Sequence, residues 1–386
     1  MPLRLNRNIV IMPSIEMKRT FHPVGQGAFY TEVFDCPNGD QKVVVYDCGT
    51  ETGKTAFNNA GAKQLNGQIM NFANSLKPLT KHIDYLFISH FHDDHISGLP
   101  DLIKVLSPRC VVIPMLPMEM ILTTRIGNLI FYGHDALSSD SIILDLYLRD
   151  EDNREVIHHL DKIIAVGSDV RDGDNVLLYP RIAPFRKDEI MSLENNGNAF
   201  WRYRPFNSVD LTDNRAKSFI DEVRKIPGIL NNDDSLNVQE VLNHMEQLKE
   251  LYKKVMNGAS DNLYTLVVES EPLRATTTKE DDSLPGCVYF GDFVPSNKVW
   301  PRFREEIDDF GDKVGIIQVP HHGSKYNWRP EMLDGGNKKH SVISAGSNNK
   351  YHHPYYWIID EIQRKGSDAH VVSEYPAAEF SLTYSL

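Results

Sequence analysis

The stretch His90-Phe91-His92-Asp93-Asp94-His95 decides how this chain folds and what it can bind. It follows residues 85–89, whose length and aromatic and β-branched side chains predict a short buried strand. After it, Pro100 in the first turn of an apolar segment predicts a helix over residues 99–106. Imidazoles and carboxylates packed between a strand and a helix converge, and such side chains are ligands of divalent metals. A solvated loop or a structural zinc site is the alternative, but this stretch lacks the cysteines usual in closed structural sites.

Composition sets limits on the class of protein. A chain of 386 residues with 41% hydrophobic content can bury a large core in one or two domains. The net charge of −12 makes it a poor general binder of polyanions, so contact with nucleic acid should be local or assisted by a metal or a partner. No apolar run reaches the length of a membrane span, and the N-terminus lacks a secretory pattern. We therefore expect a cytoplasmic protein without membrane contact.

The cysteines support the same expectation. Cys36, Cys48, Cys110 and Cys287 show no paired metal-binding spacing. They are typical of reduced, mostly buried thiols in a cytosolic protein, although the sequence leaves a contact between Cys36 and Cys48 open.

Three further apolar runs end in residues that can bind metal. These are residues 43–46 before Asp47, 288–291 before Asp292, and 314–320 before His321 and His322. One strand that ends in aspartate is ordinary turn chemistry. Four strands that deliver aspartate, a His-rich loop, aspartate and histidine in this order predict one shared metal centre.

This pattern resembles the metallo-β-lactamase superfamily, and within it the soluble nuclease-like domains of the ComEC/Rec2 competence proteins. The matching stretches are residues 24–27, 45–49, 90–100, 261–268, 289–292, 319–324 and 344–354. The His motif is specific for the superfamily, whereas His-His-Gly-Ser and Asn-Asn-Lys-Tyr-His-His-Pro point to the ComEC-like branch. The resemblance implies an α/β fold, the αββα metallo-β-lactamase sandwich, with metals at one sheet edge and phosphodiester hydrolysis as the activity.

The same resemblance implies a ligand set. Its metal ligands are His90 and His92 for the first ion, Asp94 and His95 for the second, Asp292 as the bridge and His321 as the residue that completes the second. Asp47 would orient an imidazole from outside the ligand set. Two divalent ions about 3.5–4 Å apart would generate hydroxide near neutral pH. Zinc is favoured, with manganese or iron as alternatives.

One family position is filled differently. Where relatives usually supply a further histidine between the first motif and the second aspartate, the similar segment, residues 201–206, has Arg204. One-metal occupancy therefore remains an alternative.

The remaining candidate residues concern catalysis and substrate. We assign catalytic roles to Asp94, Asp292, His322 and His353, and the last two could donate a proton or contact a phosphate. The alternative for these two is a histidine satisfied by turn hydrogen bonds. Substrate contacts are assigned to Ser324, Lys325, Arg204 and Tyr351. Rings stack on bases and cations pair with phosphates, although a half-buried strand with extended arginines explains residues 201–206 equally well.

We expect a single metallo-β-lactamase-like domain over residues 1–386, with a helical insertion at residues 207–258. Apolar positions from Val238 to Val255 recur at helical spacing, and Asn237 with Glu240 forms a capping signature, so one amphipathic helix is predicted. The insertion could cap the metal cleft, restrict substrate access or meet a regulatory partner. Residues 170–179 are typical of a hairpin, and residues 370–372 and 380–383 of closing strands.

The sequence thus favours a metal-dependent phosphodiesterase, and within that class a nuclease that cleaves DNA or RNA. The alternative is a small-molecule hydrolase acting on a lactone, a phosphocholine-type ester or a cyclic nucleotide, because one fold hosts all these activities. A metal-free binding module is a third interpretation, which elemental analysis would decide.

Overall fold

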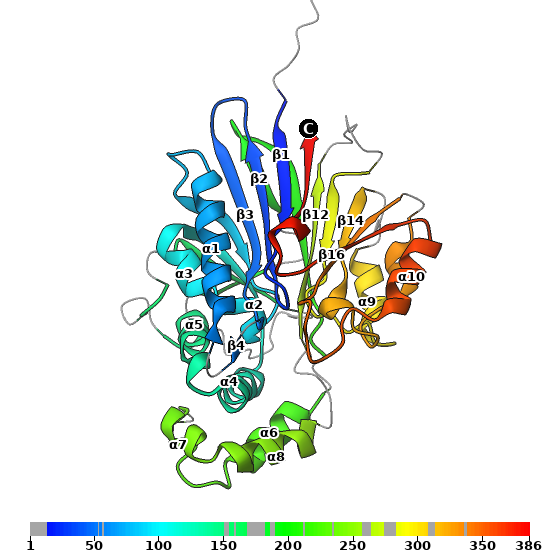
Figure 1. The fold of residues 1–386 in the computed structure, drawn as a ribbon. Helices are drawn as coiled ribbons and strands as arrows, with labels where there is room; N and C mark the ends of the chain where they lie inside the picture. Colours follow the sequence, from blue (N-terminus) through cyan, green and yellow to red (C-terminus); the bar gives the residue numbers. More distant parts are fainter. Residues whose placement is uncertain are drawn as a thin grey trace, which may run out of the picture.

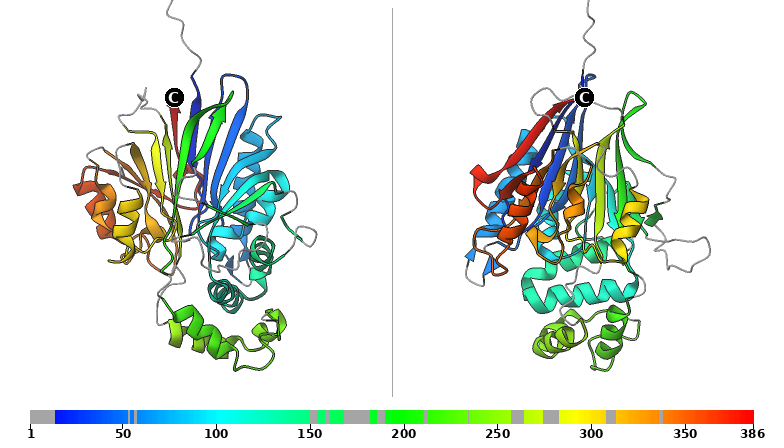
Figure 2. Two further views of the ribbon diagram at one scale, coloured as in Figure 1. Left: turned by 180° about the vertical axis from the view of Figure 1, so that it is seen from behind. Right: turned by 90° about the vertical axis from the view of Figure 1, so that its right-hand side faces the viewer.

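Two mixed β-sheets face each other and carry helices on both outer sides in the computed structural model (Figures 1 and 2). The structure describes residues 14–52, 54–55, 58–149, 154–157, 160–167, 182–185, 190–210, 213–233, 235–256, 264–273, 283–307, 313–335 and 338–386. The hairpin predicted over residues 170–179 lies outside these ranges.

The first sheet has eight strands in the order β17-β1-β2-β3-β6-β7-β8-β9. Their bounds are β1 Glu16–Phe21, β2 Phe29–Asp35, β3 Gln41–Cys48, β6 His82–Phe87, β7 Ser107–Pro114, β8 Lys162–Val166, β9 Ile182–Pro184 and β17 Phe380–Ser385. Strands β3, β6, β7, β8 and β9 run parallel to one another, so their carboxyl ends meet at one edge. A separate two-stranded sheet pairs β4 (Lys54–Thr55) with β5 (Asn58–Asn59).

The second sheet has seven strands in the order β10-β11-β12-β13-β14-β15-β16. Their bounds are β10 Met191–Asn195, β11 Asn198–Asn207, β12 Leu266–Pro272, β13 Gly286–Tyr289, β14 Val314–Gln318, β15 His340–Ser344 and β16 Asp368–Val372. Strands β13 to β16 are parallel. The two predicted closing segments are confirmed as β16 and β17, and β17 returns to pair with β1 of the first sheet.

Helices cover the outer face of each sheet. On the first sheet lie α1 (Ala60–Ser75), α3 (Leu99–Val105), α4 (Met118–Tyr132) and α5 (Leu137–Tyr147), and the second carries α9 (Val299–Glu306) and α10 (Tyr356–Arg364). Separate apolar clusters fill the helix–sheet layers, and a further one fills the space between the sheets. The αββα sandwich is confirmed, and its sheet edges bring distant parts of the chain together.

A buried charge pair crosses the layer between the sheets. Arg19 on β1 donates to the Glu32 carboxylate on β2 at 2.7 Å, and neither side chain is accessible to solvent. The same carboxylate accepts from the hydroxyls of Tyr203, Tyr289 and Ser270 at 2.7–2.8 Å. Every charge in this cluster therefore meets a partner that belongs to the protein.

The residues between β11 and β12 form three helices that pack on α4 at one end of the sandwich (Figure 1). They are α6 (Arg215–Val223), α7 (Val238–Asn243) and α8 (Met245–Met256). The single helix predicted from Val238 to Val255 is wrong in one respect, because it is interrupted at His244. There the imidazole Nδ1 donates to the Glu240 carbonyl, which also accepts the backbone N–H of the same residue. The predicted cap is confirmed, since the Asn237 side chain accepts from the backbone N–H of Glu240.

The structure also describes the four cysteines and the length and apolar character of the helices. All four cysteines are free and buried, as expected for reduced thiols. Among the described helices, none combines the length and the apolar character needed to span a bilayer.

Candidate metal centre

Side chains from both sheets converge at the edge where their parallel strands end. Asp47 lies near the end of β3, and His90 follows β6 by three residues. The short helix α2 (Asp93–Ile96) then turns Asp94 and His95 toward the opposite sheet. From that sheet, Asp292 follows β13, and His321 and His322 lie in the turn after β14. The facing edges of the two sheets thus bring together residues that are more than 200 positions apart in the sequence.

A glycine allows the two sheets to approach at this edge. Gly291 has a φ of +56°, and a Cβ on it would lie 2.8 Å from the Cβ of Ser89. Since no L side chain tolerates both this backbone conformation and this contact, the position requires glycine. The loop that carries Asp292 can therefore reach the His-rich loop of the first sheet.

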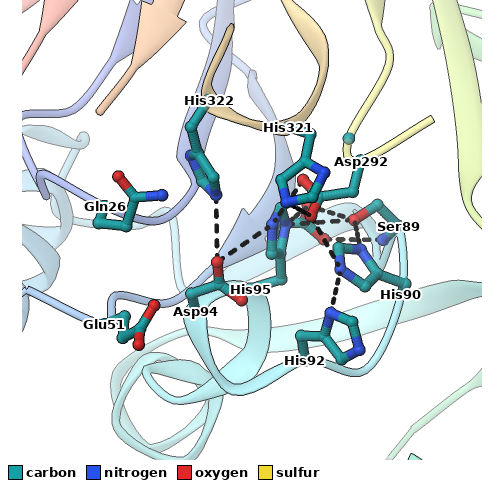
Figure 3. Close-up of polar contacts among 12 residues, drawn as sticks. Gln26, Glu51, Ser89, His90, His92, Asp94, His95, Asp292, His321 and His322 are labelled. Carbon is teal, nitrogen blue, oxygen red and sulfur yellow. Dashed lines mark hydrogen bonds and ion pairs between the residues drawn. The ribbon is translucent and has the colours of Figure 1, made fainter. Parts of the chain in front are cut away.

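Three overlapping groups of side chains offer ligand atoms within 4.8 Å of one another (Figure 3). The groups are His90, His92 and Asp94; His90, His95 and Asp292; and Asp94, His95 and His322. They share members, so they form one continuous cluster. All of its residues except the half-buried His92 are buried.

Three imidazoles of this cluster, and that of the neighbouring His321, are oriented in the same way. Each holds its Nδ1 against a partner outside the cluster, namely Ser89 Oγ for His90 at 2.9 Å, Asp47 Oδ2 for His95 at 2.7 Å, Asn327 Oδ1 for His321 at 3.1 Å and the Ser344 carbonyl for His322 at 2.7 Å. A proton on Nδ1 serves these contacts and leaves the Nε2 lone pair available. Each Nε2 faces a carboxylate of the cluster, at 3.1 Å to Asp94 for His322 and at 3.2–3.6 Å to Asp292 for the other three. Such an arrangement is typical of imidazoles that bind a metal.

Asp47 contacts the cluster through His95 and Ser89. Its carboxylate accepts from the backbone N–H and the hydroxyl of Ser89, at 2.7 and 2.6 Å, and from His95. Its own φ is +56°, a conformation that costs energy outside glycine and that the surrounding contacts hold in place. Burial raises the pKa of Asp47, and the contacts with His95 and Ser89 oppose that rise.

The charges within the cluster depend on one another. Burial alone would lower the pKa of His95, but the carboxylates of Asp94, Asp292 and Asp47 raise it well above its usual range. Burial would raise the pKa of Asp94 and Asp292, but the neighbouring imidazoles bring both below the usual range. For His90, burial and the nearby His95 lower the pKa.

These side chains fit a divalent metal. His95 Nε2 is buried and has no hydrogen-bond partner in the described part of the chain, although it lies 3.2 Å from Asp292 Oδ1 and 3.8 Å from Asp94 Oδ2. A buried nitrogen with carboxylate oxygens on two sides needs a cation or a proton. Mixed imidazole and carboxylate donors suit zinc, manganese or iron.

The structure exchanges the positions of two neighbouring histidines relative to the predicted roles. His322, given a catalytic role from the sequence, joins the group of Asp94 and His95. His321, predicted to complete that group, belongs to none of the three groups, and its Nε2 lies 3.6 Å from Asp292 Oδ2. Both have left-handed backbone conformations, with φ of 49° and 56°, which no sequence pattern reveals.

Other predicted residues lie in different places. Arg204 is on β11 and pairs with Glu269 and Glu271 of β12, beside a cavity of about 620 Å³ that Arg302 also lines. It belongs to none of the three ligand groups, and the alternative of a half-buried strand describes it. Lys325 and Tyr351 are exposed, whereas Ser324 is buried in the turn that begins at His321.

His353 lies next to the cluster. Its ring is 5.7 Å from the ring of His321, and its buried Nδ1 has no hydrogen-bond partner in the part of the chain that the structure describes. Burial together with His322 and His321 lowers its pKa to about 4, so the imidazole is neutral at pH 7.

Two functional positions were missed from the sequence. Ser89 accepts from His90 while it donates to Asp47, and Asn327 holds His321 and also donates to the carbonyls of Asp292 and Phe293. Ser89 ends the strand predicted over residues 85–89, and no sequence pattern singles out Asn327. Their side chains have no special chemistry, so only their neighbours in space reveal the role.

Comparisons with known proteins gave a family match, a sequence relative and similar solved structures. The family model of the metallo-beta-lactamase superfamily matches residues 34–172. ComE operon protein 3 of Bacillus subtilis (strain 168) is 40% identical over 52 residues, which is 14% of this chain and 7% of that protein. A long form RNase Z from yeast aligns with a TM-score of 0.34 and 9% identity, over 94% of this chain and 44% of that one. A subclass B3 metallo-beta-lactamase from a soil metagenome library aligns with a TM-score of 0.31 and 9% identity, over 78% and 77%.

Residues 34–172 are similar to the metallo-β-lactamase superfamily. The imidazoles and carboxylates of the cluster are of the kind that holds divalent metals. The segment shared with ComE operon protein 3 covers 14% of this chain and only 7% of that protein.

Proposed function

We propose that this protein is a metal-dependent phosphodiesterase and that its substrate is nucleic acid. The observation that supports this most directly is the set of four imidazoles with Nδ1 held and Nε2 turned toward Asp94 and Asp292. Exposed Lys325 and Tyr351 beside these ligands supply a cation for a phosphate and a ring for a base.

The residues that would hold two divalent ions are those of the cluster. We assign His90, His92 and Asp94 to one ion, and Asp94, His95 and His322 to the other, with Asp292 able to serve both. When bound, the ions would supply Lewis acidity toward a phosphate and lower the pKa of water toward neutrality. This assignment replaces His321 by His322 among the ligands of the second ion.

The surrounding residues have positioning and binding roles in this proposal. Asp47 and Ser89 fix the rings of His95 and His90, so their Nε2 atoms stay directed at the carboxylates. His353 is neutral at pH 7 and contributes a hydrogen bond to a phosphate oxygen or a leaving oxygen rather than a positive charge. His321 offers an Nε2 lone pair rather than a donor, because Asn327 holds its Nδ1 proton.

A hydrolase of small molecules is the second candidate, because the cluster lies close to α4, the helix on which α6 to α8 pack. Asn128 on α4 donates to the Phe91 carbonyl in the His-rich loop at 2.8 Å, so this helix lies against the cluster. Helices α6 to α8 pack on the same helix. A cap at this place would restrict access and favour a compact ester over a polymer.

Cleavage assays with matched substrates decide between the two. Protein loaded with zinc or manganese is incubated with single- and double-stranded DNA, with RNA, with bis(p-nitrophenyl) phosphate and with a panel of lactones and choline esters. We expect cleavage of polynucleotide and of the small phosphodiester, each reduced by more than about a hundredfold in His92→Ala and Asp292→Ala. Polynucleotide cleavage that survives both substitutions would refute the proposal. Turnover of lactones or choline esters without cleavage of phosphodiesters would favour the second candidate, a small-molecule hydrolase.

A further inference from the structure

A strip of rings and lysines borders the candidate metal centre. We call it the Tyr–Lys strip, and its members are Lys325, Tyr326, Lys350, Tyr351, His353 and Tyr355. They come from two loops, one that follows β14 and one that follows β15. The backbone joins these loops, because the Tyr355 N–H donates to the Gly323 carbonyl at 3.1 Å.

Contacts along the strip are continuous. Lys325 Nζ lies 4.9 Å from the ring centre of Tyr326 and 5.3 Å from that of Tyr355. The ring of His353 lies 5.7 Å from Tyr355 on one side and 5.7 Å from Tyr351 on the other, nearly parallel to Tyr351 at 24°. The rings of Tyr355, His353 and Tyr351 thus follow one another in a row, with Lys325 at one end and Lys350 at the other.

One member connects the strip to the metal ligands. The ring of His353 is 5.7 Å from that of His321, whose Nε2 lies 3.6 Å from Asp292. A polymer that presents one phosphate to Asp292 and the other ligands would therefore place its neighbouring nucleotides over the strip.

The strip is exposed, and its two ends differ in charge. Tyr326 is 77% exposed and Tyr351 is 41% exposed. Lys350 pairs with Glu51 at 2.7 Å, which offsets its charge. Lys325 makes no ion pair with any residue in the described ranges, so its charge is available to a phosphate. In a chain of net charge −12, such a cation beside the metal ligands attracts a polyanion locally.

We propose that the Tyr–Lys strip is the base-stacking subsite for a single-stranded polynucleotide, and this inference rests on the proposed function. Tyr326 and Tyr351 stack on unpaired bases, and Lys325 neutralises the phosphate between them and the metal centre. Bases in a duplex are already stacked and cannot offer their faces to these rings. The strip therefore selects single strands independently of base identity.

Binding without cleavage tests the stacking directly. Full-length protein in EDTA is titrated with a fluorescein-labelled oligothymidylate of about 12 nucleotides and with an abasic strand of equal length and charge, and anisotropy is recorded. We expect tighter binding of the oligothymidylate. Tyr326→Ala and Tyr351→Ala should each weaken it about tenfold and leave the abasic strand unaffected. Tyr326→Phe keeps the ring and should bind as the unmodified protein does.

Two further variants separate charge from stacking. Lys325→Ala should weaken binding of both strands and reduce the slope of the logarithm of affinity against that of salt by about one. Tyr375→Ala removes another exposed tyrosine, one without a contact to the strip among the described residues, and should change nothing. Equal affinity for the two strands, or full affinity in Tyr326→Ala, would overturn the inference.

Hydrolysis of bis(p-nitrophenyl) phosphate separates this inference from the proposed function, because that substrate carries no base. If bis(p-nitrophenyl) phosphate is hydrolysed but Tyr326→Ala binds oligothymidylate with full affinity, the strip is not a stacking subsite and the phosphodiesterase proposal stands. If base-dependent binding holds but neither substrate is cleaved, the subsite stands and the proposed function fails.

Discussion

Two clusters of buried charges in this sandwich are built in opposite ways. Between the sheets, Glu32 accepts from Arg19 and from three hydroxyl groups, so its charge is compensated within the protein. At the sheet edge, the Nδ1 atoms are held by outer partners, while the Nε2 atoms and carboxylates crowd a common space. The first arrangement is complete without a ligand, whereas the second is favourable only with a cation or shared protons.

This contrast separates stability from function. A closed pair keeps its partners through folding and offers no place for another molecule. A cluster that turns its lone pairs inward gives up stability in the free protein and recovers it on binding. Substitutions in the two clusters should therefore affect different measurements.

The largest expected effect on stability comes from Glu32→Gln. Removing the carboxylate charge leaves the guanidinium of Arg19 buried without its ion-pair partner, and such losses cost about 3–5 kcal/mol of unfolding free energy. Urea unfolding monitored by circular dichroism measures this. Activity per folded molecule should stay unchanged, because the pair does not contact the metal ligands.

The matched control replaces both charges. Arg19→Met with Glu32→Leu removes both charges but leaves the hydroxyls of Tyr203, Tyr289 and Ser270 without this acceptor, so it should recover only part of the loss. If Glu32→Gln cost under about 1 kcal/mol, or lowered metal affinity, the two clusters would not be independent and the contrast would fail.

Metal addition should produce the next effect, and only at the edge. Zinc at about 100 times its dissociation constant should raise the unfolding free energy by about 2.7 kcal/mol per site. The gain should vanish in Asp292→Ala and persist in Glu32→Gln. Unfolding curves with EDTA and with zinc, recorded for all three proteins, give the comparison. Equal stabilisation in Asp292→Ala would place the metal elsewhere.

A smaller effect is expected from Asp47→Asn, which keeps the shape of the side chain and weakens its hold on His95. Loss of such an outer carboxylate lowers metal affinity or activity by about 10–100-fold. Competition with a chromogenic chelator measures the affinity. Asp101→Asn, at an exposed position on α3, serves as the control. Unchanged affinity in Asp47→Asn would show that Ser89 alone holds the imidazoles.

The sequence predicted the sandwich and its edge because the relevant signals are local. Residues 85–95 alone predict a strand that ends in a His-rich loop, and the strands before Asp47 and Asp292 are likewise predicted from local sequence. Parallel strands bring such ends to a common edge, so convergence follows from topology alone. The helical segment between β11 and β12 was legible for the same reason, through its period and its Asn237 cap.

Other features depend on contacts that no local pattern contains. The exchange between His321 and His322 arises from two successive left-handed residues, and the sequence does not show which ring then faces Asp94. At the break at His244, the imidazole Nδ1 and the backbone N–H share the Glu240 carbonyl, a contact that helical periodicity does not show. From the sequence, Arg204 was assigned to substrate binding. In the structure, Glu269 on the neighbouring strand forms an ion pair with it and offsets its charge.

The smallest expected effect concerns a region that belongs to neither cluster. Asn237→Ala removes the cap of α7 and should cost about 1 kcal/mol of unfolding free energy. If helices α6 to α8 cap the cleft through α4, loosening them should also change KM for bis(p-nitrophenyl) phosphate while metal affinity stays constant. Glu246→Ala, at an exposed position of α8, is the matched control, because it leaves the Asn237 cap intact. A KM equal to that of the unmodified protein, with the stability loss confirmed, would show that the insertion supports the fold without controlling access.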